Sequence, residues 1–131
     1  MSSPNGTTIF PIQWLNDERT ILQVTLPASF TWDEQNKSVR EVAETIRTVD
    51  HTVHLVVNTV GAKMPKGNPF PHLRYFVMSM PDNLGVTITV GAGRVERTIV
   101  GAFLRIAHRF GAKETYIVET MDEAMAILTG K

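Results

Sequence analysis

Val53-His54-Leu55-Val56-Val57 is the stretch that decides the fold. Four of its five residues are apolar, three of them are β-branched, and no polar alternation marks one side as facing water. A continuous apolar run of this length is typical of a central strand in a parallel sheet, because such a strand is buried on both faces. We therefore expect an α/β domain built around this run, with His54 as a hydrogen-bonded structural residue.

The residues before this run predict a hairpin followed by a helix. Two β-rich runs, 9–15 and 20–26, flank a polar four-residue turn. The alternation in the second run favours a strand with one well-buried face. Thr31 stands three residues before Glu34, which is the spacing of a capping box, and an amphipathic pattern over 32–48 follows. The helix is expected to cover one side of the core.

After the central run, helices and strands alternate to the end of the chain. The pattern predicts a helix over 69–80, a strand over 86–90, a helix over 94–110, a strand over 115–119 and a capped terminal helix. The order β-β-α-β-α-β-α-β-α indicates a single α/β domain over residues 8–131, with a small mixed sheet and right-handed crossovers. Residues 1–7 are expected to be disordered.

The composition excludes several classes of function. Thirteen basic and thirteen acidic residues give a formal net charge of zero, so we expect no nucleic acid as a partner. The chain contains no cysteine, which rules out disulfides and thiolate metal sites and favours a reducing, cytoplasmic location. No window approaches the roughly 18 apolar residues that a membrane span needs.

The second half of the chain carries a family resemblance. The strand from Val86, the Gly91-Ala92-Gly93 turn, the helix ending in Phe110-Gly111 and the segment 119–128 together resemble the anti-sigma-factor-antagonist (STAS) superfamily. The chain looks most like its SpoIIAA-like, SEC14-type group of small bacterial proteins, and the order of elements over 8–130 matches too. The resemblance implies a compact α/β domain that acts by protein–protein contact or small-ligand binding, without catalysis. We predict no cofactor.

One segment departs from the pattern of the phospho-switched members. Those members carry a phosphorylatable serine at the start of the second helix, whereas this chain has Asn58-Thr59-Val60-Gly61 there. Thr59 is the nearest hydroxyl. A conventional phospho-switch is therefore not expected.

The third predicted helix carries a basic stripe. At about 100° per residue, one side of this helix gathers cations around a single glycine, opposite an apolar side. We interpret this side as a surface for an anion or an acidic partner, and the alternative is an ordinary solvated helix face. With the nearby turn and loop, the candidate recognition surface comprises Arg94, Arg97, Gly101, Arg105, His108, Gly91, Gly93, Thr59, Lys63 and Lys66.

The Gly91-Ala92-Gly93 turn has two interpretations. It matches the first half of a dinucleotide-binding fingerprint, in which backbone amides at a helix N-terminus hold phosphate. Glu96 stands where that fingerprint needs its third glycine. The alternative is a tight turn that requires a positive φ.

A third group of residues is large and apolar. Met64, Phe70, Phe76 and Met80 make the loop and the second helix apolar on more than one side. Three explanations stay open: a homodimer interface, the wall of a pocket for an apolar ligand, and simple core packing.

No pattern in the sequence indicates catalysis. The four histidines show no metal-ligand spacing, and no serine stands in a nucleophile signature. We predict no metal and no enzyme activity. The favoured function is a regulatory module with a protein partner, and the alternatives are a carrier of a small apolar or anionic ligand and a cryptic enzyme.

Overall fold

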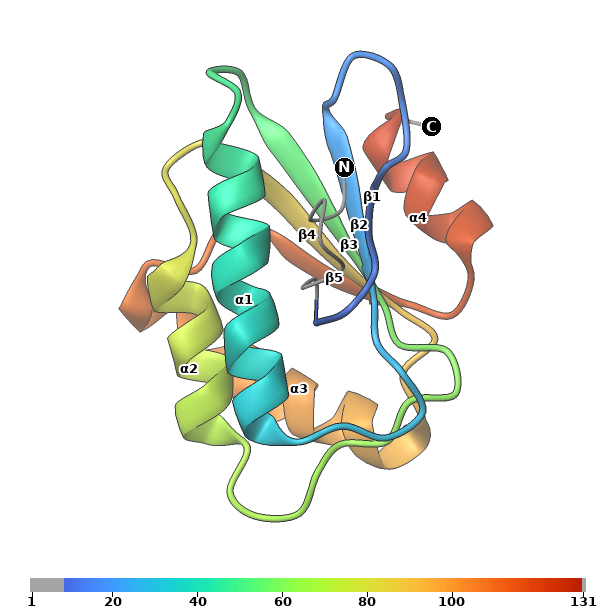
Figure 1. Cartoon of the computed structure of the whole chain (residues 1–131). Helices are drawn as coiled ribbons and strands as arrows, with labels where there is room; N and C mark the ends of the chain where they lie inside the picture. The colour runs from blue at the N-terminus through green and yellow to red at the C-terminus, as the bar shows by residue number, and fades with distance from the viewer. Residues whose placement is uncertain (1–8, 131) are drawn as a thin grey trace.

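A five-stranded mixed sheet forms the centre of the computed structural model, which describes residues 9–130 (Figure 1). The strands lie in the spatial order β1-β2-β3-β4-β5. β1 (Ile12–Trp14) pairs antiparallel with β2 (Ile21–Thr25), and β3 (Val53–Asn58), β4 (Leu84–Val90) and β5 (Thr115–Val118) follow in parallel. The predicted order of elements and the mixed sheet are confirmed. The expected disorder of residues 1–7 lies outside the described residues.

The helices are divided unequally between the two faces of the sheet. α1 (Trp32–Arg47), α2 (Phe70–Ser79) and α3 (Arg94–Ala107) lie on one face, and α4 (Met121–Leu128) lies on the other (Figure 1). The three connections between parallel strands advance in one direction across the same face, so they have a single handedness, in keeping with the crossovers predicted.

The helix boundaries follow the capping residues. Thr31 and Thr120 each accept a hydrogen bond from the backbone of the third helical residue, and both predicted capping boxes are complete. The third helix ends at Ala107, three residues earlier than predicted, and continues as a 3-10 turn, η1 (His108–Phe110). Gly111 then takes a left-handed conformation with φ of 86°, which ends the helical segment.

The central strand β3 is joined to β4 through an irregularity at His54. The register shifts there, because His54 alone stands opposite Gly85 and Val86. The Val86 amide donates a hydrogen bond of 3.0 Å to Nδ1 of His54, which replaces a missing backbone partner. A Cβ at position 85 would lie 2.6 Å from the same nitrogen, so only glycine fits. The prediction that His54 is a structural residue is confirmed.

Each face of the sheet has its own apolar core. The core beneath α1 consists of Phe10, Ile12, Leu22, Val24, Val42, Ile46, Val53, Leu55 and Leu84. The core beneath α4 consists of Ile21, Val56, Ile88, Val90 and Ala124. The prediction of one buried face for residues 20–26 was therefore too narrow, because Ile21 is buried against the second core.

Within residues 9–130, no helix has both the length and the apolar character that crossing a bilayer requires.

Candidate functional site

A partly open cavity of about 160 Å³ lies between the sheet and the layer of α1, α2 and α3. Val57, Thr87 and Thr89 contribute from the sheet, and the helices contribute mainly apolar side chains. These include Val39, Val42, Leu73, Phe76, Val77, Val100, Phe103 and Leu104. The residues that line the cavity come from every third of the chain, so the fold assembles it and no single motif encodes it.

Helix α2 forms one wall of the cavity and is loosely packed. None of its residues is buried, although Leu73, Phe76 and Val77 all line the cavity. Polar contacts hold α2 against α1 on its outer side. Arg40 donates a hydrogen bond of 3.0 Å to the Tyr75 hydroxyl, and this bond raises the pKa of Arg40 above its ordinary value. The side chains of α2 that line the cavity are partly buried, and Phe76 also packs against the core beneath α1.

The loop between β3 and α2 closes one end of the cavity. Its backbone is fixed at three points: the Lys63 amide donates to the Ala28 carbonyl at 3.1 Å, the Met64 amide donates to Glu96 Oε2 at 3.2 Å, and the Lys66 carbonyl accepts from Trp32 Nε1 at 2.9 Å.

The Trp32 indole also stacks on the His72 ring, with the ring centroids 4.5 Å apart. This stack ties the start of α1 to the start of α2. The loop end of the cavity is therefore better fixed than the α2 side.

Two buried residues contribute hydroxyl groups to the cavity wall. Ser38 on α1 is 3% exposed and Thr87 on β4 is 5% exposed, and they are the buried polar side chains among the described residues. Two other lining hydroxyls are already engaged, because Thr59 donates to the Val90 carbonyl at 2.8 Å and Thr115 donates to the Lys113 carbonyl at 2.9 Å. Within residues 9–130 the structure gives the Ser38 and Thr87 hydroxyls no such partner.

The four large apolar residues that the sequence analysis grouped together do not all lie at one cavity. Met64 and Phe76 line the cavity, and the Phe70 ring meets the lining residue Phe103 edge-on at 5.7 Å. Met80 lies instead at a second hollow of about 250 Å³, which also contacts Phe76. Phe76 and Met80 also pack against the core beneath α1. Core packing therefore accounts for part of this group, and a ligand pocket or a dimer interface stays a prediction.

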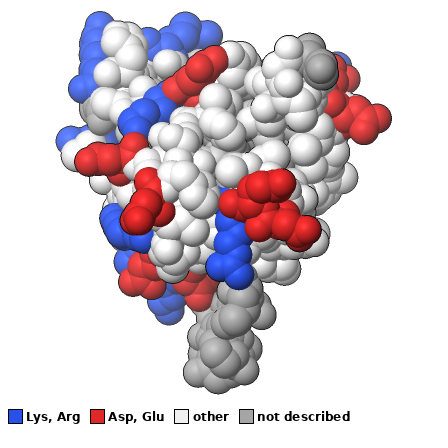
Figure 2. Space-filling model, turned by 90° about the horizontal axis from the view of Figure 1, so that it is seen from above, with Lys and Arg blue, Asp and Glu red and all other residues white. Residues whose placement is uncertain are grey.

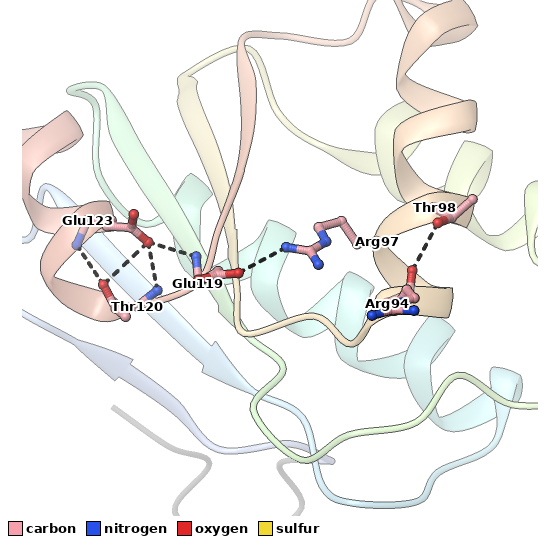
Figure 3. A network of polar contacts seen from close by, with 6 residues as sticks. All are labelled: Arg94, Arg97, Thr98, Glu119, Thr120 and Glu123. Carbon is pink, nitrogen blue, oxygen red and sulfur yellow. Dashed lines mark hydrogen bonds and ion pairs between the residues drawn. The ribbon is translucent and has the colours of Figure 1, made fainter.

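The predicted basic stripe lies on the exposed side of α3. Arg94, Arg97, Arg105 and His108 are all exposed, and the space beside Gly101 is open. Arg97 forms an ion pair of 3.2 Å with Glu119 at the end of β5 (Figure 3). The stripe is therefore partly neutralised by an acidic neighbour from another element.

The glycine turn before α3 matches the tight-turn interpretation. Gly91 has φ of 78°, and a Cβ there would lie 2.4 Å from Cγ2 of Val60. The Glu96 carboxylate lies beside Gly93, since a Cβ at Gly93 would come within 2.7 Å of its Oε1. This carboxylate occupies the N-terminus of α3, where a bound phosphate would need to lie.

Charge is mixed over the surface. On the face that Figure 2 shows, acidic and basic side chains lie interspersed, and a group of basic side chains gathers at the upper left. Lys63 and Lys66 are exposed in the loop after β3. Within residues 9–130, no three histidine or acidic side chains lie where they could hold a metal ion together.

Ser38, Thr87 and Thr89 were missed as candidate residues at the level of the sequence. A usable signal was present in Val86-Thr87-Ile88-Thr89-Val90, where period-two alternation places both threonines on one face of a strand. Ser38 stands four residues before Val42 on the apolar side of α1 and interrupts that side with a hydroxyl.

Searches of family models, curated proteins and solved structures find no match to this chain. The resemblance to STAS domains stays a prediction.

Proposed function

We propose that this protein binds a small, mainly apolar ligand in the cavity between the sheet and α1, α2 and α3. The observation that carries this proposal is the cavity itself, about 160 Å³ in volume and lined mostly by apolar side chains. An apolar cavity of about 150 Å³ accommodates benzene, so a compact ligand of roughly six to ten non-hydrogen atoms matches the space. The binding is non-catalytic.

The size of the ligand limits the affinity. Small ligands gain between about 0.3 and 1.5 kcal/mol per non-hydrogen atom. A ligand of about seven such atoms, at roughly 0.7 kcal/mol each, binds with a dissociation constant of roughly 0.1 to 1 mM. Binding in this range is measured readily by NMR.

Helix α2 gives the ligand its route to the cavity. Burial of apolar side chains is the main force that fixes a surface helix, and no residue of α2 is buried. Displacing α2 from the sheet therefore costs less than displacing α1, which has five buried residues.

Methyl NMR with toluene as the probe tests the proposal. We expect shifts of the methyl signals of Val57, Leu73 and Val100 that saturate with toluene concentration. Val100→Phe fills the cavity and should abolish these shifts. Val95→Phe is the matched control on the same helix, because Val95 is 64% exposed and does not line the cavity. Shifts that persist in Val100→Phe, or no saturable shift in the wild-type protein, would contradict the proposal.

A second candidate is protein contact, as the STAS resemblance implies. Val60 and Val95 are large apolar residues that stay 65% and 64% exposed, and both lie beside the turns that end the parallel strands. We propose that these exposed residues mediate self-association, and that the protein acts in the cytoplasm. Sedimentation velocity over a range of concentrations tests it: Val60→Asp should convert a dimer into a monomer, and a wild-type protein that stays monomeric would contradict it.

A further inference from the structure

The cavity is mainly apolar, and its polar lining consists of Gln35, Lys63, Glu96, the Trp32 indole and several hydroxyl groups. Ser38 reaches it from α1 and Thr87 reaches it from β4, so one hydroxyl comes from the helix layer and the other from the sheet. Neither hydroxyl has a hydrogen-bond partner within the described residues, and neither oxygen is sealed from solvent, because the enclosed side-chain atom without a partner in residues 9–130 is Oδ1 of Asn36. Two hydroxyls that open into one cavity without a partner in the protein are in a position to hydrogen-bond a ligand in place of water.

The residues that pair with Thr87 in the sheet offer its hydroxyl no hydrogen bond. Thr87 stands between Leu55 and Thr115 in the register of the sheet. Leu55 offers no polar group, and the Thr115 hydroxyl donates to the Lys113 carbonyl. The strand neighbours therefore leave the Thr87 hydroxyl unpaired, and it is open to an atom inside the cavity or inside the second hollow, which Thr87 also lines.

The two faces of β4 differ in the polarity of their side chains. Val86, Ile88 and Val90 pack on the side of α4, and the alternate positions Thr87 and Thr89 line the cavity. A valine in place of either threonine would match its shape without a hydroxyl. The polar atoms thus lie on the cavity side of the strand alone.

The charged groups at the cavity favour a neutral ligand. Among the described residues that line it, only Lys63 and Glu96 carry charge. Lys63 is exposed to solvent, and one carboxylate oxygen of Glu96 already accepts from the Met64 amide. A charged ligand would lose its hydration without a buried partner of opposite charge.

We infer that the ligand is a compact neutral molecule that carries one polar group, a hydroxyl or a carbonyl, which hydrogen-bonds with Ser38 and Thr87. This inference rests on the proposed function and names the class of molecule that the cavity takes.

Toluene and phenol form the matched pair of probes that tests this inference. They have the same shape, and they differ by a methyl group in place of a hydroxyl. In a cavity without hydrogen-bond partners, phenol binds more weakly, because its hydroxyl leaves water unpaired. We expect the wild-type protein to bind phenol at least as tightly as toluene in an NMR titration.

Three variants separate the contribution of the two hydroxyls. Ser38→Ala and Thr87→Val should each weaken phenol binding by up to about tenfold, and both should leave toluene binding unchanged or tighter. Thr98→Val is the control, because it makes the same change on α3 at a hydroxyl that donates to the Arg94 carbonyl and does not line the cavity. It should leave the ratio of the two affinities unchanged.

The outcomes distinguish the inference from the proposed function. Toluene binding that exceeds phenol binding in the wild-type protein, or a phenol affinity that neither variant lowers, overturns the inference and leaves the proposed function standing. Saturable binding of neither probe overturns both. Thr87→Val preserves the shape of the side chain, so it provides the test even where Ser38→Ala fails to fold.

Discussion

The two faces of the sheet are covered by different numbers of helices, and each has a buried apolar core, but the face with three helices also contains a cavity. A single short helix, α4, covers one face, and there Val56, Ile88, Val90 and Ala124 are almost completely buried. Three helices cover the other face, and yet that face contains a cavity. The number of helices therefore does not decide the packing.

The side chains explain this difference. On the α4 side the strands present valine and isoleucine, whereas on the cavity side β4 presents Thr87 and Thr89 beneath the loosely packed α2. Apolar side chains that interdigitate leave few voids, and two threonines opposite partly buried helix residues leave one.

Adjacent valines on β3 test the comparison most strongly. Val56 is buried in the core beneath α4, and Val57 lines the cavity on the other face. We expect Val56→Ala to lower the free energy of unfolding by about 2 to 3 kcal/mol, and Val57→Ala by about 1 kcal/mol. Urea denaturation measures both. Equal losses would show that the two faces are packed alike.

The second largest expected effect is a difference in amide hydrogen exchange between α1 and α2. Both cover the cavity face, but only α1 has buried residues. We expect amide hydrogens in the middle of α2 to exchange with solvent about 10 to 100 times faster than those of α1. Hydrogen exchange read by mass spectrometry checks this, and equal protection of the two helices would contradict the account of α2 as a loosely held wall.

Two threonines on the cavity face should respond with opposite signs. Thr87→Val replaces a hydroxyl that has no partner in the protein with a methyl group in a mainly apolar cavity wall, and should raise the free energy of unfolding by about 0.5 to 1 kcal/mol. Thr115→Val removes a hydroxyl that donates to the Lys113 carbonyl and should lower it by up to about 1 kcal/mol. Denaturation with urea measures both, and a loss in Thr87→Val would show that its hydroxyl has a partner within the protein.

The smallest effect concerns Tyr116 at the edge of the core beneath α4. Its hydroxyl donates to the Glu114 carboxylate, which raises the pKa of Tyr116 above its ordinary value of 10.0. The favourable contribution is present below the ordinary pKa and is lost as the pH rises through the raised one. Glu114→Gln should lower the pKa of Tyr116, measured by phenolate absorbance in a Tyr75→Phe background. An unchanged titration would show that the bond is absent in solution.

The sequence allowed the order of elements to be predicted because the relevant signals are local. The apolar run at 53–57, the two capping boxes and Gly111 each report on a few neighbouring residues, and the structure has the corresponding elements. Period and capping depend little on what lies across the molecule.

The cavity could not be predicted in this way. The cavity is a space that side chains distant in sequence, such as Ser38, Thr87 and Val100, leave unfilled. The pairing of Arg97 with Glu119 is equally non-local, and it neutralises part of a stripe that the sequence presents as purely basic. Helical spacing correctly placed the stripe on one exposed side, and its function as a recognition surface stays a prediction.

The central claim is that the cavity is a binding site for a compact neutral ligand. A crystal structure determined with phenol tests it most directly. The account predicts phenol between α2 and the sheet, with its oxygen within hydrogen-bond distance of the Ser38 or Thr87 hydroxyl. Protein side chains that fill the same space, or phenol found only on the outer surface, would contradict it.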